Sequence, residues 1–277
     1  MLKIENVEVM GWEAAIRGMR NPMNSWEKSD SFCHPTLGHC NDCPVRNKCA
    51  YIFEQDGKPY RSGIGSEDLD LMTRLRNAGT DHRKFMRMIT VYLDITAPLY
   101  WWKEFDTYKV GTVANSCSTM HKIADKEFTL DDFSHEHLIT REKPLVEGVD
   151  APEPPNAIWL IHRTIQTLNQ YRNLYLQTKD KKYWWQLIQL LPSSYNQRRT
   201  VMLNYEVLAN IYKSRRNHKL DEWKKLYKWI ESLPYSKLIT GPSAEEVECN
   251  INLPSNDMIL GEVTPFDLKP ENFKEEK

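Results

Sequence analysis

The stretch that decides the fold is LMTRLRNAGTDHRKFMRMITVYLDITAPLYWWKEF, Leu71–Phe105, in which the apolar pattern changes period twice. Its first part continues the helix SEDLDLMTRLRNAG, for which Ser66 is the expected N-cap and Gly79 the expected end. From His82 the period becomes two, which predicts a strand. The apolar residues on one face of that strand are Phe85, Ile89, Val91, Leu93 and Ile95. Pro98 can then open a helix, and PLYWWKEF fits one that carries bulky aromatic side chains.

The segments on either side complete an α+β pattern. Ile4, Val7 and Val9 indicate a short strand, and GWEAAIRGMR a helix that ends before Asn21-Pro22. A segment rich in Pro and acid, REKPLVEGVDAPEPPNA, leads into a half that is expected to be almost wholly helical, over 157–171, 181–192, 198–216 and 220–234. The expected organisation is a sheet-bearing half 1–140 with a Cys-rich insertion 30–60, a linker 141–156, a helical half 157–234 that completes the site, and an irregular tail 235–277.

Composition excludes several classes of protein. The 277 residues are 40% hydrophobic and carry a formal net charge of −1, which argues against bulk electrostatic binding to nucleic acid. An anion site must therefore be local, and the cluster KSRRNHK, Lys213–Lys219, is either such a site or a solvated helix end. Two pairs of tryptophans form either a stacking surface or, as is usual for paired aromatics, a core or subunit contact: Trp101 with Trp102 and Trp184 with Trp185. The start MLKIENVEVM is unlike a signal peptide and the apolar runs are short, so we expect a cytoplasmic location without membrane contact.

The strongest local chemical signal is SFCHPTLGHCNDCPVRNKC, with the spacing C-x6-C-x2-C-x5-C. Four clustered thiols in a reducing compartment are typical of metal ligands rather than disulfides. The predicted ligands are Cys33, Cys40, Cys43 and Cys49. Spacing does not separate zinc from a [4Fe–4S] cluster, although the uneven gaps and the Pro after Cys43 lean slightly toward iron–sulfur. His34 and His39 are possible substitutes, and four unligated thiols in a loop are the alternative.

A run of small polar residues follows the aromatic block, in EFDTYKVGTVANSCSTMHKI, Glu104–Ile123. Small side chains before a helix let backbone amides approach an anion, with Lys109 and His121 as added charge. The alternative is a turn packed under aromatic neighbours. Cys117, next to Ser118, is either a bystander or a nucleophilic thiol, and free Cys is usually the former.

The order of these segments resembles the flavin-dependent thymidylate synthases over most of the chain, apart from the Cys-bearing insertion, the linker and the tail. Two parts of the first half are similar to that family: VEVMGWEAAIRGMR and the stretch Leu71–Phe105. A later block is similar as well, LLPSSYNQRRTVMLNYEVLANIYKSRRNHKLDEW. The resemblance implies reductive methylation of dUMP to dTMP with FAD, NADPH and methylenetetrahydrofolate. It also implies a homotetramer with sites built between subunits, to whose contacts the LYWWKEF helices contribute. The alternatives are a catalytically altered or inactive relative that binds nucleotide or flavin, for example one that hydroxymethylates dUMP, and a metal-cluster interaction protein.

The same resemblance implies roles for individual residues. Thr107, Tyr108 and Lys109 stand in place of the family's Arg-His-Arg triplet, and Glu104 in place of a Gln. An Arg expected before Leu191-Pro192 is missing, with Gln189 or Gln186 nearby. The implied substrate-binding residues are Glu104, Lys109, Ser118, His121 and Gln189. The implied cofactor-binding residues are Thr107, Tyr108, Asn115 and Asn204. The implied catalytic residues are Arg215 and Arg216, either of which fits the Arg that contacts the pyrimidine and precedes Trp223.

Overall fold

The computed structural model describes residues 2–31, 53–55, 58–60, 64–140 and 156–242. Contacts group Met1–Gly241 into one compact unit. The four clustered cysteines, nearly all of the linker expected at 141–156 and the tail beyond residue 242 lie outside the described residues. The metal-ligand prediction therefore stays a prediction.

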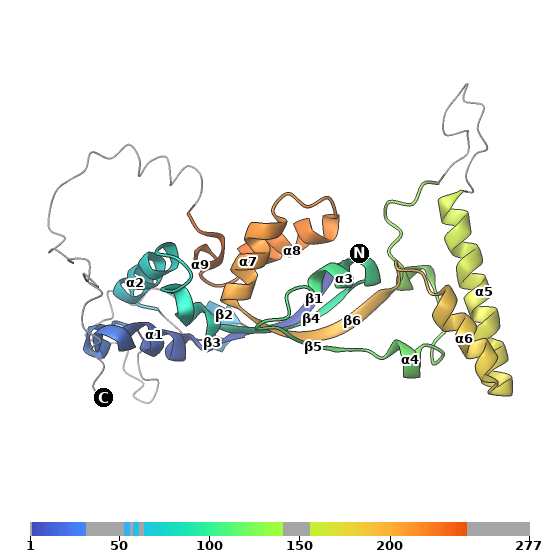
Figure 1. Cartoon of the computed structure of the whole chain (residues 1–277), viewed down its shortest axis with the longest axis horizontal. Helices are drawn as coiled ribbons and strands as arrows, with labels where there is room; N and C mark the ends of the chain where they lie inside the picture. Colours follow the sequence, from blue (N-terminus) through green and yellow to red (C-terminus); the bar gives the residue numbers. More distant parts are fainter. Residues whose placement is uncertain (1, 32–52, 56–57, 61–63, 141–155, 243–277) are drawn as a thin grey trace, which may run out of the picture. The chain divides into compact units, whose positions relative to one another are not determined.

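A four-stranded antiparallel sheet carries the fold, with the strand order β1-β4-β6-β5 (Figure 1). The strands are β1 Lys3–Met10, β4 Thr90–Pro98, β5 Val113–Ser116 and β6 Asn196–Asn204. A separate two-stranded sheet pairs β2 Phe53–Gln55 with β3 Lys58–Tyr60. The strands expected near the N-terminus and after His82 are confirmed, as is the mixed α+β class, but β4 begins later than expected because Arg83–Arg87 form a 3-10 helix, η5.

Strand β6 shows that the expectation of a helix over 198–216 is wrong for its first part. β6 pairs with β4 along its whole length, from Thr90 opposite Asn204 to Pro98 opposite Asn196. Val201 and Leu203, two residues apart, both point into the core, as alternate residues of a strand do. The apolar run therefore forms a strand first, and the helix α7 (Tyr205–Arg215) begins after it. Ladder bonds to β4 outweigh local helix preference in this segment, as tertiary context commonly does.

The small polar run was expected either to bring backbone amides to an anion or to form a turn packed under aromatic neighbours, but part of it is a strand. Residues of β5 pair with β6, from Val113 opposite Met202 to Ser116 opposite Arg199. The ladder occupies part of the backbone that was expected to approach a ligand. The helix expected after it is only α4, Thr119–Lys122, whose N-cap Ser118 accepts a bond from His121 N at 3.1 Å.

Two apolar clusters lie within the unit. The first packs the buried sheet face against α1 Trp12–Arg20, α2 Ser66–Asn77, α3 Leu99–Phe105, α7 Tyr205–Arg215, α8 Asp221–Glu231 and α9 Lys237–Thr240. The second joins α4 and the 3-10 helix η6 Leu130–Asp132 to α5 Ala157–Thr178 and α6 Lys181–Leu190. No helix within the described ranges is long and apolar enough to cross a bilayer.

The aromatic side chains of α3 belong to the chain's own core. Trp101 is 0% exposed, Trp102 1% and Phe105 2%, and their rings pack on one another and on Trp223. These three rings are therefore not available for the subunit contacts that the family resemblance implies for the LYWWKEF helix.

Hydrogen bonds and a buried ion pair join residues Arg20, Ser29 and Asp30 to the first turn of α2. Arg20 Nε donates to Asp68 Oδ1 at 2.6 Å, and Ser29 Oγ donates to Asp68 Oδ2 at 2.6 Å. Asp30 accepts bonds from the backbone N–H groups of Glu67 and Asp68 at 3.0 and 3.1 Å. The first turn of α2 is therefore capped by a residue distant in sequence, and Ser66 is the first helical residue rather than the expected N-cap.

Candidate functional site

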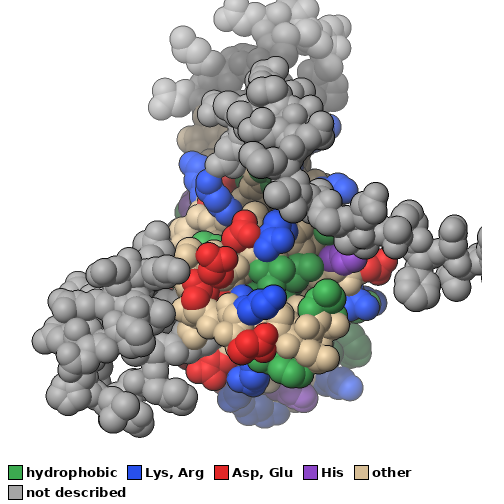
Figure 2. All heavy atoms as spheres, turned by 90° about the vertical axis from the view of Figure 1, so that its left-hand side faces the viewer, with side chains coloured by type: hydrophobic (Ala, Val, Ile, Leu, Met, Phe, Trp, Pro, Cys, Tyr) green, Lys and Arg blue, Asp and Glu red, His purple; other side chains and the backbone are tan. Residues whose placement is uncertain are grey.

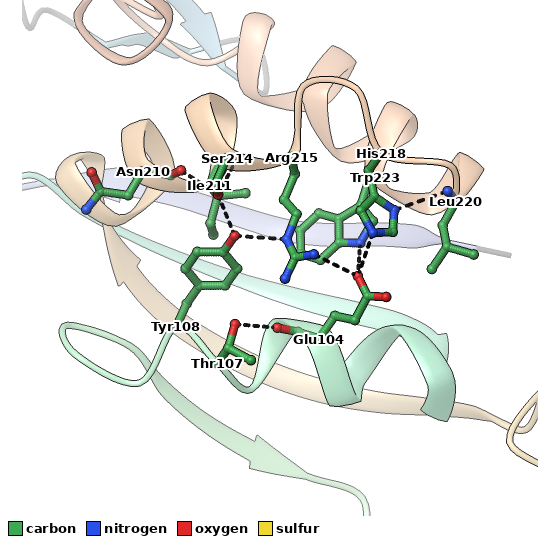
Figure 3. Close-up of polar contacts among 10 residues, drawn as sticks. All are labelled: Glu104, Thr107, Tyr108, Asn210, Ile211, Ser214, Arg215, His218, Leu220 and Trp223. Carbon is green, nitrogen blue, oxygen red and sulfur yellow. Dashed lines mark hydrogen bonds and ion pairs between the residues drawn. The ribbon is translucent and has the colours of Figure 1, made fainter.

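Glu104, near the end of α3, is the centre of a polar cluster between α3, α7 and α8 (Figure 3). Its Oε2 lies 3.2 Å from Arg215 Nη1, 3.0 Å from His218 Nε2 and 2.9 Å from Trp223 Nε1. Leu220 N donates to His218 Nδ1 at 3.2 Å, so the proton of a neutral imidazole lies on Nε2 and points to the carboxylate. One carboxylate oxygen thus collects donors from three segments of the chain.

Arg215 is held in this cluster by two aromatic rings, a hydroxyl and a carboxylate. Its guanidinium carbon lies 5.7 Å from the ring centre of Tyr108 and 5.0 Å from that of Trp223, within cation–π range. Its Nε donates to the Tyr108 hydroxyl at 3.0 Å, and its charge is paired with Glu104. Arg215 is therefore a positioned cation whose charge is already compensated.

The residues that replace the Arg-His-Arg triplet are mostly engaged within the chain. Thr107 Oγ1 donates to the carbonyl of Glu104 at 2.7 Å, and the hydroxyls of Tyr108 and Ser214 share a hydrogen bond of 2.6 Å. Lys109 is exposed. The structure therefore brings Glu104, Thr107, Tyr108 and Arg215 together, and of the triplet positions Lys109 alone carries a charge.

A cavity of about 680 Å³ lies beside α7, next to α2, η5 and α9. Four cationic side chains line it and no acidic side chain does. The cationic residues are Arg76, Arg83, Lys213 and Arg216. Asn77, Thr80 and Asn210 add polar groups, so the lining is suited to an anion with several hydrogen-bond acceptors.

The charge of this cationic cavity is only partly compensated. Arg83 pairs with Glu206 at 3.4 Å, whereas Arg76 donates to the backbone carbonyls of Leu238 and Ile239, each at 3.2 Å. Burial, and after it repulsion from Arg83, lower the pKa of Arg76. An anion in the cavity would relieve that repulsion. Within the described part of the chain no carboxylate lies at ion-pair distance from Lys213 or Arg216.

Ser118 lines a second cavity, of about 230 Å³, with an aromatic floor of Phe128 and Tyr195. Each of its cations is paired with a carboxylate: Lys122 with Asp125 at 2.8 Å, Lys126 with Asp132 at 2.5 Å and Arg198 with Asp94 at 2.6 Å. Cys117, a free and exposed thiol, also lines it, while His121 is exposed on α4. This cavity is therefore more nearly neutral than the cationic cavity.

The remaining expected site residues are dispersed. Asn204 ends β6, and its Oδ1 accepts a bond from Val207 N at 3.0 Å, which caps α7. Gly111, with φ of 79°, approaches it so closely that a Cβ there would lie 2.9 Å from Asn204 Nδ2. Asn115 pairs with Thr200 in the sheet, and Gln189 is exposed on α6.

Sequence reasoning did not find every residue of these sites. Lys213 and Arg216 belong to the noted cluster KSRRNHK, but Arg76 and Arg83 carried no signal because they come from other elements. His218 was part of the same cluster without an assigned partner. Among the described residues no group of three or more His, Cys, Asp or Glu is placed to hold a metal ion.

Comparison with solved structures identifies the fold. Thymidylate synthase X from Helicobacter pylori, solved with FAD and dUMP, superposes with a TM-score of 0.54 at 15% identity, over 87% of this chain and 97% of that chain. A second structure of the flavin-dependent thymidylate synthase from Helicobacter pylori, also with FAD and dUMP, gives 0.52 at 14% identity, over 85% and 97%. A UMP/dUMP methylase from Streptomyces cacaoi, bound with 5-Br dUMP, gives 0.50 at 11% identity, over 85% and 92%.

Sequence comparison adds nothing to this, since no protein-family model and no curated protein matches the chain. The structural likeness nevertheless extends over nearly the whole length of the solved proteins, at low identity. The chain therefore has the fold of the flavin-dependent thymidylate synthases.

Proposed function

We propose that the protein is a flavin-dependent enzyme that reductively methylates dUMP to dTMP. The observation that carries the proposal is the cationic cavity in a fold whose solved examples hold FAD with dUMP, or a dUMP analogue. FAD and dUMP both carry phosphate, and a group of arginines and lysine whose charge is only partly compensated suits phosphate better than a neutral ligand.

The residues of the cationic cavity fit the diphosphate of FAD. Lys213 and Arg216 would bind phosphate oxygens, because no carboxylate in the described residues competes for them. Arg76 and Arg83 would add positive charge, and Asn210 an amide for hydrogen bonds. Bound FAD would supply hydride transfer, with NADPH as reductant and methylenetetrahydrofolate as the carbon source.

Arg215 and Arg216 are neighbours in sequence with different roles in this proposal. Arg216 lines the cationic cavity and is the arginine available to an anionic ligand. Arg215, paired with Glu104 and enclosed by two rings, positions the end of α7 and presents hydrogen-bond donors without net charge. The Ser118 cavity, with its aromatic floor and paired cations, is then the better place for an uncharged part of the nucleotide, such as the pyrimidine.

Further parts of the proposal come from the sequence. The four clustered cysteines would bind zinc or a [4Fe–4S] cluster, and the enzyme would act as a homotetramer. The elements after the linker would complete the site, as α7 and α8 complete the Glu104 cluster.

A relative that binds flavin or nucleotide without turnover is the second candidate. It is favoured by the engagement of Thr107, Tyr108 and Arg215 in internal hydrogen bonds, which leaves fewer groups for polarising a substrate.

Three measurements distinguish these functions. The visible spectrum of anaerobically purified protein should show flavin bands, and a broad brown absorbance would identify an iron–sulfur cluster. Calorimetry should show that FAD and dUMP bind, and that Arg216→Ala weakens binding of at least one of them about tenfold or more. Lys224→Ala, on the exposed face of α8, is the matched control.

Turnover decides between the two candidates. Formation of dTMP from dUMP with FAD, NADPH and methylenetetrahydrofolate supports the enzyme. Binding without any product supports the non-catalytic relative. If neither ligand produces heat with metal-replete protein, the whole proposal fails.

A further inference from the structure

Glu206, in the first turn of α7, is a buried carboxylate whose partner Arg83 lines the cationic cavity. On the face shown in Figure 2, by contrast, acidic and basic side chains lie next to one another at the surface, where water screens their charges. Glu206 is only 7% exposed, and within the described part of the chain the other buried acidic residues are Asp68 and Glu222. Burial of a carboxylate is costly unless cations and hydrogen bonds compensate it. The groups that compensate Glu206 therefore indicate what it does.

Two arginines of η5 compensate this carboxylate. Arg83 Nε lies 3.4 Å from Glu206 Oε1. Arg87 donates to both carboxylate oxygens, from Nε to Oε2 and from Nη2 to Oε1. Two positive charges and one negative charge leave the group with a net charge of +1. The Arg87 side chain is 56% exposed and is not among the residues that line the cavity, whereas that of Arg83 is 17% exposed and lines it. Glu206 can therefore hold Arg83 while the group stays positive.

Helix α7 fixes one edge of the Arg83 guanidinium. Glu206 and Asn210 are four residues apart, so they lie on one face of the helix. Arg83 Nε donates to Glu206 and Arg83 Nη2 to Asn210 Oδ1, at 3.4 and 3.1 Å, and these two nitrogens form one edge of the planar group. Arg83 Nη1 has no hydrogen-bond partner within the residues that the structure describes. That nitrogen is therefore available to a ligand in the cavity.

Repulsion from a neighbouring arginine opposes this position of Arg83. Burial, and after it repulsion from Arg83, lower the pKa of Arg76, which lines the same cavity. Arg76 is itself held by bonds to backbone carbonyls of α9. Among the described contacts of Arg83, the one to Glu206 is made to a negative charge, and it is stronger than a bond to the neutral Asn210. Loss of the Glu206 carboxylate should therefore let Arg83 move away from the anion site.

We propose that Glu206 is a positioning residue for a diphosphate in the cationic cavity: it holds Arg83 so that Arg83 Nη1 donates to a phosphate oxygen. This rests on the proposed function, in which the diphosphate belongs to FAD. Arg83 makes the contact, and Glu206 acts through Arg83 without touching the ligand. A carboxylate near an anion site repels the anion, so its removal would strengthen binding if charge alone mattered. The positioning role requires the opposite, that removal weakens binding.

The test compares Glu206→Ala, Arg83→Ala and the double variant in the full-length protein, by calorimetry with FAD and with inorganic pyrophosphate. We expect Glu206→Ala to weaken binding of both ligands about tenfold, the loss expected for one charge-assisted hydrogen bond. In the Arg83→Ala background, Glu206→Ala should weaken binding no further, because no guanidinium remains to be positioned. Arg87→Ala should weaken binding less than about threefold, because the side chain is exposed and lies outside the cavity lining.

A buried carboxylate elsewhere provides the control for stability. Glu222 is also 7% exposed but is not among the residues that line the cavity. Glu222→Ala should lower the melting temperature, followed by circular dichroism, without weakening either ligand. A merely structural role of Glu206 would make the two variants alike. If Glu206→Ala does not fold, Glu206→Gln, which keeps the shape and removes the charge, should weaken binding in the same direction.

The outcomes separate this inference from the proposed function. The inference is overturned if Glu206→Ala leaves binding unchanged or strengthens it, or if it weakens binding equally in the Arg83→Ala background. FAD binding that is indifferent to Glu206→Ala would refute the inference and leave the proposed function intact. Pyrophosphate binding with the expected pattern, without FAD binding, would support the role of Glu206 and refute the proposed function. If wild-type protein binds neither ligand, both fail.

Discussion

Replacing Asp68 by Ala tests how much the buried ion pair between Arg20 and Asp68 stabilises the fold. Asp68 is 0% exposed and Arg20 5%, and the two side chains are joined at 2.6 Å. Truncating the carboxylate leaves a buried guanidinium without its counter-charge and removes the acceptor of the Ser29 hydroxyl. Breaking one side of a buried ion pair costs about 3–5 kcal/mol, much more than the net stabilisation that the intact pair provides.

The same helix supplies a matched control. Asp70 pairs with Arg74 at 2.8 Å, but these side chains are 61% and 69% exposed. An exposed pair at this spacing is worth about 0.3–0.5 kcal/mol. Asp70→Ala also makes the same change in helix propensity, so the difference between the two variants reports burial.

The assay is urea unfolding followed by circular dichroism at the helical band. We expect Asp68→Ala to lower the free energy of unfolding by about 3–5 kcal/mol and the melting temperature by roughly 6–20 °C, for a chain of this size. Asp70→Ala should change the free energy by less than about 1 kcal/mol. If the two variants lower the free energy of unfolding by the same amount, the buried pair stabilises the fold no more than the exposed pair, and the reasoning is wrong. If Asp68→Ala does not fold, Asp68→Asn compared with Asp70→Asn gives the same contrast.

Two further predictions concern single positions in the described structure, and a third concerns the cysteine cluster. Burial opposes the ionisation of Asp30, but hydrogen bonds from the N–H groups at the start of α2 outweigh it, and the pKa of Asp30 is lowered overall. The stabilisation by this cap is therefore present at neutral pH and is lost as the pH falls through the lowered pKa. Asp30→Ala should cost about 1 kcal/mol near neutral pH and progressively less in acid, measured by urea unfolding at several pH values. Gly111→Ala should cost about 1–3 kcal/mol, more than the control Gly79→Ala, because both sites have positive φ but only Gly111 would also clash; equal losses would contradict this. Cys40→Ser or Cys43→Ser should lower the metal content and expose residues 32–60 to limited proteolysis with the helical signal retained, as metal ligation supplies about 10 kcal/mol in small structural sites; unchanged metal and cleavage would refute the ligand prediction.

Local periodicity predicted much of the fold because each of those segments has only one way to bury its apolar face. The period-two run through Val91 and Ile95 had to be a strand, and the spacing of Ile161, Ile165 and Leu168 had to be a helix. The failures at β6 and β5 share one cause. A short segment such as Val113–Ser116, or the run through Val201 and Leu203, becomes a strand only because a neighbouring strand supplies its hydrogen bonds.

The part of the candidate site that lies close together in sequence was predictable, as the local helices and strands were. Residues close in sequence, such as Glu104, Thr107 and Tyr108, were found together from the resemblance and are held together in the structure.

By itself the sequence determined the α+β class, most helices, the cysteine cluster and the cluster KSRRNHK, because these depend on spacing along the chain. Only the tertiary structure decided that Arg215 turns to Glu104 while Arg216 joins Arg76 and Arg83 in a cavity. Two adjacent residues leave a helix about 100° apart, and which face meets a carboxylate or an open cavity is set by how distant elements pack.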